Sequence, residues 1–211
     1  LQLIANICLS NRPIYLSRHG ESEYNVLGKL GGDSALSARG LRYAENLAAF
    51  MRSDEGLGSN FENLHVWTSS LNRTIMTAKV LGLNTTRWRA LDEIDAGRCD
   101  GLTYEQIKEE MPTEYLDRQK NKLCYRYPQG ESYQDLIHRL EGVIVELERH
   151  PGPLLIVSHQ AVLRVLIAYC MRMRPADAPD LDVPLHVLIK LTPSAYGCDE
   201  QRHILGPGSG S

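Results

Sequence analysis

The chain of 211 residues lacks the features that mark several large classes of protein. It has no apolar run of the roughly 18 residues that a membrane span requires. Its five cysteines are an odd number, and no two of them form a CxxC motif. This argues against a disulfide framework and against a structural zinc site. We therefore expect a protein of a reducing compartment and place it in the cytoplasm.

A strong charge of either sign is also missing. The formal net charge is -3, from 23 Lys and Arg against 26 Asp and Glu. Binding to a nucleic-acid backbone needs a basic excess, so nucleic acid is not expected as the main partner, although a local basic pocket stays open. The content of 43% hydrophobic and 23% charged residues is that of an ordinary globular protein. The length allows one large domain, or two small ones.

Short apolar runs alternate along the chain with segments whose apolar residues recur at helical spacing. The short runs predict strands at 13–17, 64–68, 153–159 and 186–192. The periodic segments predict helices at 37–53, 70–82, 103–111, 131–150 and 161–171. This alternation predicts an α/β fold with three α/β/α layers around a mostly parallel sheet.

Polar side chains gather where three of these strands end. Arg18 and His19 follow the first strand, His159 ends the third, and Arg73 lies shortly after the second. Ligands of parallel sheets bind beyond the carboxyl ends of the strands. Arginine repels metal ions but binds phosphate oxygens bidentately, and histidine can donate to phosphate or attack it. The pattern therefore predicts a phosphate-handling site with no metal and no cofactor.

Four blocks of sequence carry a resemblance to a known family. They are "RHGESEYN" (18–25), "TSSLNRTIMTA" (68–78), "EIDAGRCDG" (93–101) and "VSHQAVLR" (157–164). The triplet "RHG" is weak evidence alone, but the four blocks in this order resemble the histidine phosphatase superfamily, which has the phosphoglycerate-mutase-like fold. The stretches 28–40 and 115–149 resemble one branch, the bisphosphatase domains of 6-phosphofructo-2-kinase/fructose-2,6-bisphosphatases.

The resemblance also divides the chain into three parts. Residues 1–12 resemble the segment that follows the kinase domain in that branch, which implies an upstream kinase domain. The chain itself has no GxxxxGK[ST] phosphate loop. Residues 13–195 are expected to form the phosphatase domain, and residues 196–211 a flexible tail.

The activity that the resemblance implies is hydrolysis of the 2-phosphate of fructose 2,6-bisphosphate through a phosphohistidine. His19 would be the nucleophile, with a pKa lowered by neighbouring cations. Arg18, Arg73 and His159 would stabilise the transferring phosphoryl group. Glu93 would protonate the departing alkoxide and later activate water. Spacing alone leaves Asp92 and Asp95 open for that last role.

Substrate-binding residues are implied in the same way. For the 2-phosphate they are Asn25, Gln160 and the backbone amide of Gly31. For the sugar and its 6-phosphate they are Tyr104, Arg118, Lys122 and Tyr133, with Arg164 as a further substrate-side arginine.

Two other functions stay open at this stage. One is a mutase or a broader sugar-phosphate phosphatase that uses the same machinery. The other is a non-catalytic domain that binds phosphosugars. The expected 6-phosphate clamp of Arg118 and Lys122 favours a bisphosphorylated sugar over a three-carbon acid, and the presence of His19 and Glu93 favours catalysis.

Overall fold

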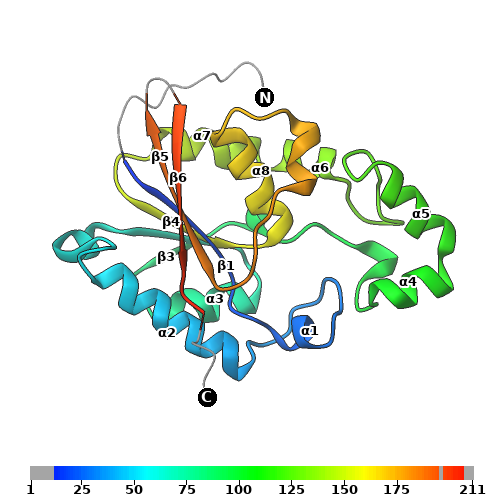
Figure 1. The fold of residues 1–211 in the computed structure, drawn as a ribbon, viewed down its shortest axis with the longest axis horizontal. Coiled ribbons are helices and arrows are strands. Elements are labelled where there is room, and N and C mark those ends of the chain that lie inside the picture. The colour runs from blue at the N-terminus through cyan, green and yellow to red at the C-terminus, as the bar shows by residue number, and fades with distance from the viewer. Residues whose placement is uncertain (1–11, 195–196, 207–211) are drawn as a thin grey trace.

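The computed structural model describes residues 12–194 and 197–206, which form a six-stranded sheet with helices on both faces (Figure 1). The strand order is β3-β2-β4-β1-β5-β6. Strands β1 to β4 are parallel, and β5 and β6 are antiparallel to their neighbours at one edge. The strands are β1 (Ile14–Arg18), β2 (His65–Thr68), β3 (Thr85–Arg87), β4 (Leu154–Ser158), β5 (Val187–Ser194) and β6 (Gly197–Ile204).

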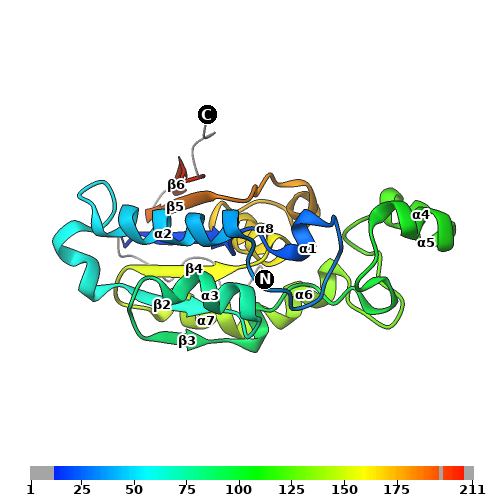
Figure 2. The same cartoon turned by 90° about the horizontal axis from the view of Figure 1, so that it is seen from below.

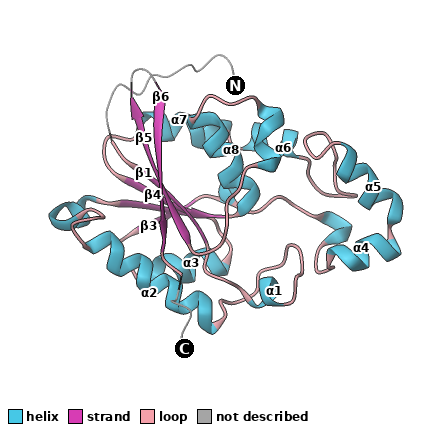
Figure 3. Ribbon diagram, viewed as in Figure 1, coloured by secondary structure: helices cyan, strands magenta, loops and turns pink. Residues whose placement is uncertain are grey.

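The helices of the two outer layers pack on opposite sides of this sheet (Figure 3). One layer consists of α2 (Ala38–Arg52) and α3 (Asn72–Lys79), the other of α6 (Tyr133–Arg139), α7 (Glu141–Arg149) and α8 (Gln160–Cys170). Successive residues of β1 point to opposite faces of the sheet. Tyr15 packs in the apolar cluster under α2 and α3, and Leu16 packs in the cluster under α6, α7 and α8. The expected three-layer α/β/α fold is confirmed.

A small lobe stands beside the carboxyl ends of the parallel strands (Figure 1 and Figure 2). It consists of α4 (Tyr104–Glu110) and α5 (Pro112–Lys120), with α1 (Glu23–Val26) nearby. The lobe has a separate apolar cluster around Ile107 and Tyr127. Short 3₁₀ helices complete the fold: η1 (Gly58–Asn63), η2 (Arg89–Leu91), η3 (Gly97–Cys99) and η4 (Pro175–Asp180).

Two expectations about helices were incomplete. The single helix expected over 131–150 is two helices, α6 and α7, that meet at Leu140, close to Gly142, a residue that weakens helices. The helix expected over 103–111 is followed directly by a second helix that was not expected, α5, which begins at Pro112, because proline fits the first turn, where its missing N–H has no helical partner.

The expectation of a flexible tail over 196–211 was wrong for residues 197–204. These residues form β6, which pairs with β5 from Ser194↔Gly197 to Val187↔Ile204. Most side chains of β6 are polar and at least partly exposed, as suits an edge strand. The composition of this segment therefore resembled that of a flexible tail. Residues 1–11 of the expected segment 1–12, and residues 196 and 207–211 of the expected tail, lie outside the described residues.

Within the described ranges, the structure has no helix with both the length and the apolarity needed to cross a membrane.

Two glycines fix the position of the chain just after β1. Gly20 follows His19 and is packed against Gly40 in α2. A Cβ atom on Gly20 would collide with the carbonyl oxygen of Gly40, and one on Gly40 with the carbonyl oxygen of Glu21. The close approach of the two backbones therefore requires glycine at both positions.

We expect Gly20→Ala to lower the free energy of unfolding by about 1–3 kcal/mol, as overpacking does. The matched control is Gly142→Ala, because Gly142 is exposed in α7 with open space where a Cβ atom would lie. Alanine there should leave stability unchanged or slightly raised. Urea denaturation of both variants measures the effect, and a Gly20→Ala protein as stable as wild type would contradict it.

Candidate active site

One cavity lies between the carboxyl ends of β1 and β4 and the lobe of α4 and α5. His159 is the one expected site residue outside the cavity lining, and its ring centroid lies 5.2 Å from that of His19. The expected residues that line the cavity are Arg18, His19, Asn25, Gly31, Arg73, Glu93, Tyr104, Arg118, Lys122, Tyr133, Gln160 and Arg164. The fold thus brings them to one place, while their individual roles remain predictions.

His19 is buried and held in one tautomer. Its Nδ1 lies 2.7 Å from the carbonyl oxygen of Gly20, which can only accept, so Nδ1 carries the proton and Nε2 keeps its lone pair. Burial, with smaller effects from the charges of Arg73 and Arg18, holds the pKa of His19 well below its usual range. The sequence suggested the cations as the cause, but burial is the larger one. At pH 7 the ring is neutral, as a nucleophile requires.

His159 is the first residue after β4 and is fully buried. Its Nε2 lies 2.8 Å from the hydroxyl of Ser69, which in turn contacts the hydroxyl of Thr74 at 2.8 Å. Its Nδ1 has no hydrogen-bond partner among the described residues. Burial, followed by the charge of Arg73, lowers the pKa of His159 well below its usual value. One nitrogen is therefore oriented by the protein, and the other is buried beside the cavity without a hydrogen-bond partner among the described residues.

The two arginines beside these histidines are each anchored by a backbone carbonyl. Arg18 Nη1 donates to Val183 at 3.0 Å, and Arg73 Nη1 donates to Gly32 at 2.5 Å. Burial lowers the pKa of Arg18 to about 10, so its guanidinium stays charged at pH 7. Arg73 is buried and Arg18 half-buried, and the charge of Glu93 acts on both guanidiniums. Guanidiniums held in this way can bind an anion in the cavity that they line.

Asn25 and Gln160 contribute neutral donors to the same part of the cavity. The side-chain oxygen of Asn25 accepts from the backbone N–H of Ser22 at 3.0 Å in the capping box of α1. This contact orients the amide and leaves its NH₂ group to donate elsewhere. Gln160 Nε2 is 3.4 Å from the Val183 carbonyl. Gly31 has a φ of +67°, and a Cβ atom there would collide with the Asp100 carboxylate.

Of the three neighbouring carboxylates, Glu93 is the one that lines this cavity. Its Oε1 accepts from the backbone N–H of Ile94 at 3.0 Å and from that of Ala161 at 3.3 Å, in the first turn of α8. Asp92 instead accepts from the hydroxyl and backbone N–H of Ser70, and Asp95 from the backbone N–H of Gly97. The geometry favours Glu93 among the candidates that spacing had left open.

A second group of cations comes from α5 and the segment after it. Arg118 donates from Nε to the hydroxyl of Tyr127 at 2.8 Å, and its guanidinium carbon lies 4.9 Å from the ring centroid of Tyr104. Lys122 Nζ lies 2.6 Å from an Asp180 carboxylate oxygen in an exposed ion pair. The cavity is therefore cationic both at the strand ends and on the lobe.

Arg164 and Tyr133 connect these two regions. Arg164 donates from Nε to the Leu181 carbonyl at 2.7 Å and from Nη1 to the hydroxyl of Tyr133 at 3.2 Å. The sequence reasoning missed Lys29 and Tyr127, which also line the cavity. The tyrosine pair in "YRYP" was the available signal for Tyr127, but such aromatics usually belong to a core. Within residues 12–194 and 197–206, no group of three or more His, Cys, Asp or Glu side chains is arranged to hold a metal ion.

Curated proteins similar to this chain are bifunctional by name. The 6-phosphofructo-2-kinase/fructose-2,6-bisphosphatase 1 of Rattus norvegicus is 53% identical over 92% of this chain and 40% of that protein. The 6-phosphofructo-2-kinase/fructose-2,6-bisphosphatase 3 of Homo sapiens is 51% identical over 92% of this chain and 36% of that protein. The chain thus spans well under half the length of the curated relatives it matches.

Solved structures share the fold at low sequence identity. A putative α-ribazole-5'-P phosphatase from Escherichia coli has a TM-score of 0.80 and 24% identity, over 94% of this chain and 97% of that chain. A mycobacterial glucosyl-3-phosphoglycerate phosphatase has a TM-score of 0.75 and 24% identity, over 92% and 98%. Such likeness establishes the fold alone. The model of the histidine phosphatase superfamily (branch 1) matches residues 14–204, and the chain therefore belongs to the histidine phosphatase superfamily.

Proposed function

We propose that this chain hydrolyses the 2-phosphate of fructose 2,6-bisphosphate and releases fructose 6-phosphate and phosphate. The observation that carries the proposal is a buried neutral His19 in a cavity with cations at two places, the strand ends and the lobe. Two cationic regions suit a small molecule with two phosphates. The bisphosphatase names of relatives about 50% identical over 92% of the chain support this particular sugar.

In the first step, Nε2 of His19 attacks the phosphorus of the 2-phosphate as the bond from phosphorus to the sugar oxygen breaks. The departing oxygen takes a proton from Glu93. Arg18 and Arg73 stabilise the charge on the phosphoryl oxygens. The imidazole becomes positively charged, and the bond from Nδ1–H to the Gly20 carbonyl strengthens as this charge develops.

In the second step, water attacks the phosphohistidine and gives a proton to the Glu93 carboxylate. The bond from phosphorus to Nε2 breaks, phosphate leaves, and His19 regains its lone pair. Glu93 is protonated again and ready for the next turnover, so the two steps together consume one water molecule.

The wider setting of the chain remains a prediction. The kinase activity in the names of the relatives supports an upstream kinase domain as a partner. We also propose a cytoplasmic location, which suits an odd number of cysteines without a CxxC motif. The alternative functions are a mutase and a broader sugar-phosphate phosphatase with the same catalytic residues. Comparing the rate of phosphate release from fructose 2,6-bisphosphate with the rates from other phosphorylated sugars and acids distinguishes them from the proposed function.

The first prediction concerns the covalent intermediate. With fructose 2,6-bisphosphate labelled at the 2-phosphate, rapid quenching should trap acid-labile, base-stable label on the wild-type protein, which then disappears as phosphate is released. His19→Ala should trap none. His138→Ala, which alters an exposed histidine on α6, is the matched control and should behave as wild type. Rapid phosphate release without label would exclude the phosphohistidine route, and neither label nor release would exclude this substrate.

The second prediction assigns the proton donor. Glu93→Gln should slow phosphohistidine formation from the same substrate by about 10²–10⁴-fold, the usual contribution of a general acid. Asp92→Asn and Asp95→Asn serve as matched controls and should each cost less than about 10-fold, since these groups lie on a neighbouring cavity. If Asp95→Asn had the larger effect in single-turnover measurements, the acid would be Asp95.

The third prediction follows from the lowered pKa values of His19 and His159. In the unfolded chain both imidazoles bind protons near the usual pKa of about 6.5, whereas the folded protein keeps them neutral to lower pH. Stability should therefore be fully present above about pH 6.5 and fall as the pH decreases below it, by up to about 1.4 kcal/mol per pH unit for each histidine.

Urea denaturation between pH 7.5 and 5.5 measures this dependence, and ¹⁵N NMR of the imidazoles follows each ring directly. His19→Ala should have a shallower dependence than wild type over the same range. An imidazole of His19 that titrates near pH 6.5 in the folded protein would contradict the prediction.

A further inference from the structure

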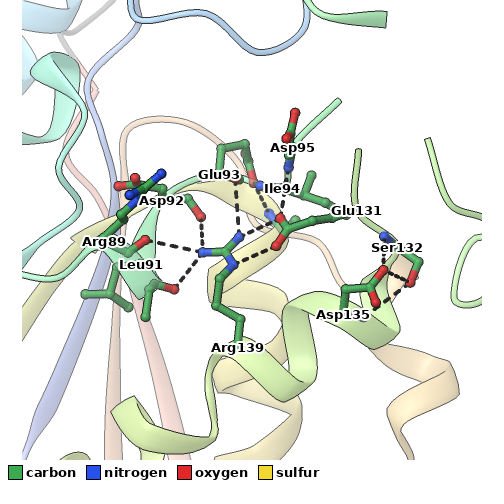
Figure 4. Close-up of polar contacts among 12 residues, drawn as sticks. Arg89, Leu91, Asp92, Glu93, Ile94, Asp95, Glu131, Ser132, Asp135 and Arg139 are labelled. Carbon is green, nitrogen blue, oxygen red and sulfur yellow. Dashed lines mark hydrogen bonds and ion pairs between the residues drawn. The ribbon is translucent and has the colours of Figure 1, made fainter. Parts of the chain in front are cut away.

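Arg139, the last residue of α6, contacts the loop that carries Glu93 (Figure 4). We call residues 89–95 the Glu93 loop. The guanidinium donates from Nη1 to the backbone carbonyls of Ala90 at 2.8 Å and Asp92 at 3.0 Å, and from Nη2 to that of Glu93 at 3.4 Å. A single side chain thus links three carbonyls of η2 and the residues that follow it.

The same guanidinium is fixed from its other side by Glu131. Arg139 Nε lies 2.9 Å from Oε1 of Glu131, and Nη2 lies 2.8 Å from Oε2, which is a bidentate ion pair between side chains that are each 23% exposed. Oε2 of Glu131 also accepts from the backbone N–H of Asp95 at 3.0 Å. The ion pair therefore contacts the Glu93 loop on both sides of Glu93.

The guanidinium suits this position better than an ammonium group. Arginine presents five N–H donors in a planar fork, and here all three nitrogens are engaged. Lysine has one nitrogen and could not reach the carboxylate and three carbonyls together. Neither residue lines the main cavity with His19, and both line the neighbouring cavity, which Glu93 also lines. The pair is therefore in direct contact with the loop and not with a ligand bound beside His19.

We propose that Arg139, held by Glu131, is a positioning residue that fixes the Glu93 loop and so aims the Glu93 carboxyl at the departing oxygen. The proposal rests on the proposed function, in which Glu93 is the proton donor. Two hydrogen bonds hold the carboxyl group at the cavity, because its Oε1 accepts from the backbone amides of Ile94 and Ala161. If Arg139 is removed, the backbone at 92–95 is less restrained and these two hydrogen bonds weaken.

The first readout needs no activity. In Arg139→Ala, hydrogen exchange at the amides of Ile94 and Ala161 should be at least about ten-fold faster, because these amides are bonded to Glu93. Amides of β4 should be unchanged. The loop retains a second tie, from the hydroxyl of Ser158 to the Leu91 carbonyl at 2.7 Å, so the fold should survive. Faster exchange throughout the sheet would mean a merely structural role and would overturn the proposal.

The second readout separates proton donation from phosphate binding. Phosphohistidine formation from fructose 2,6-bisphosphate releases a basic alkoxide and needs the acid, whereas 4-nitrophenyl phosphate releases a stable phenolate and does not. Arg139→Ala should slow the first reaction by about 100-fold and the second by less than about 3-fold, as expected for a misplaced acid. Equal losses on the two substrates would overturn the proposal.

Milder variants and a matched control complete the test. Arg139→Lys and Glu131→Gln should give intermediate losses with the sugar, and Arg139→Ala should add little in a Glu93→Gln background. Arg126→Ala removes another ion pair to α6, Arg126–Asp135 at 2.6 Å, without touching the Glu93 loop and should leave both readouts unchanged. If wild type formed phosphohistidine from neither substrate, the proposed function would fail, while the exchange at Ile94 and Ala161 would still decide whether Arg139 positions Glu93.

Discussion

The site depends on the parallel pairing of β1 with β4. Their register places Arg18 opposite Ser158, and the backbone N–H of His19 continues the ladder to the Ser158 carbonyl at 3.0 Å. Because parallel strands end at the same edge, the residues that follow them, His19 and His159, are brought to a ring separation of 5.2 Å although they lie 140 positions apart in the chain. Without this pairing neither histidine would meet the other.

Backbone carbonyls hold the charged groups around these histidines. Those of Gly20, Gly32 and Val183 accept from His19, Arg73 and Arg18 respectively. Each bond satisfies part of a donor and fixes its direction, and the negative charge that acts most strongly on both guanidiniums is the Glu93 carboxylate. The donors are thus oriented before a ligand arrives, which is the kind of preorganisation that favours binding of an anion.

The acid side of the site is built differently. Glu93 lies on an irregular loop, and no strand end or long helix fixes its backbone. The Arg139–Glu131 ion pair takes over that task from α6 and from the turn before it. His19, the proposed nucleophile, is thus positioned by the sheet, whereas Glu93, the proposed acid, lies on a loop held by an ion pair.

The sequence by itself determined the layered α/β fold, the strands that lead to His19 and His159, and the residues that gather around them. Local patterning carries this information, because apolar runs and helical spacing decide which segments are buried and where they end. The tail at 197–204 was misjudged, because strand β6 is polar and owes its structure to pairing with β5. Only the tertiary structure showed that Glu93, and not Asp92 or Asp95, lines the cavity, that burial keeps His19 neutral, and that Arg139 contacts the Glu93 loop. In each case the cause is contact between segments that are distant in the chain. The sequence alone gives no sign of the role of Arg139, because an arginine eight residues after Glu131 is typical of a solvated helix face.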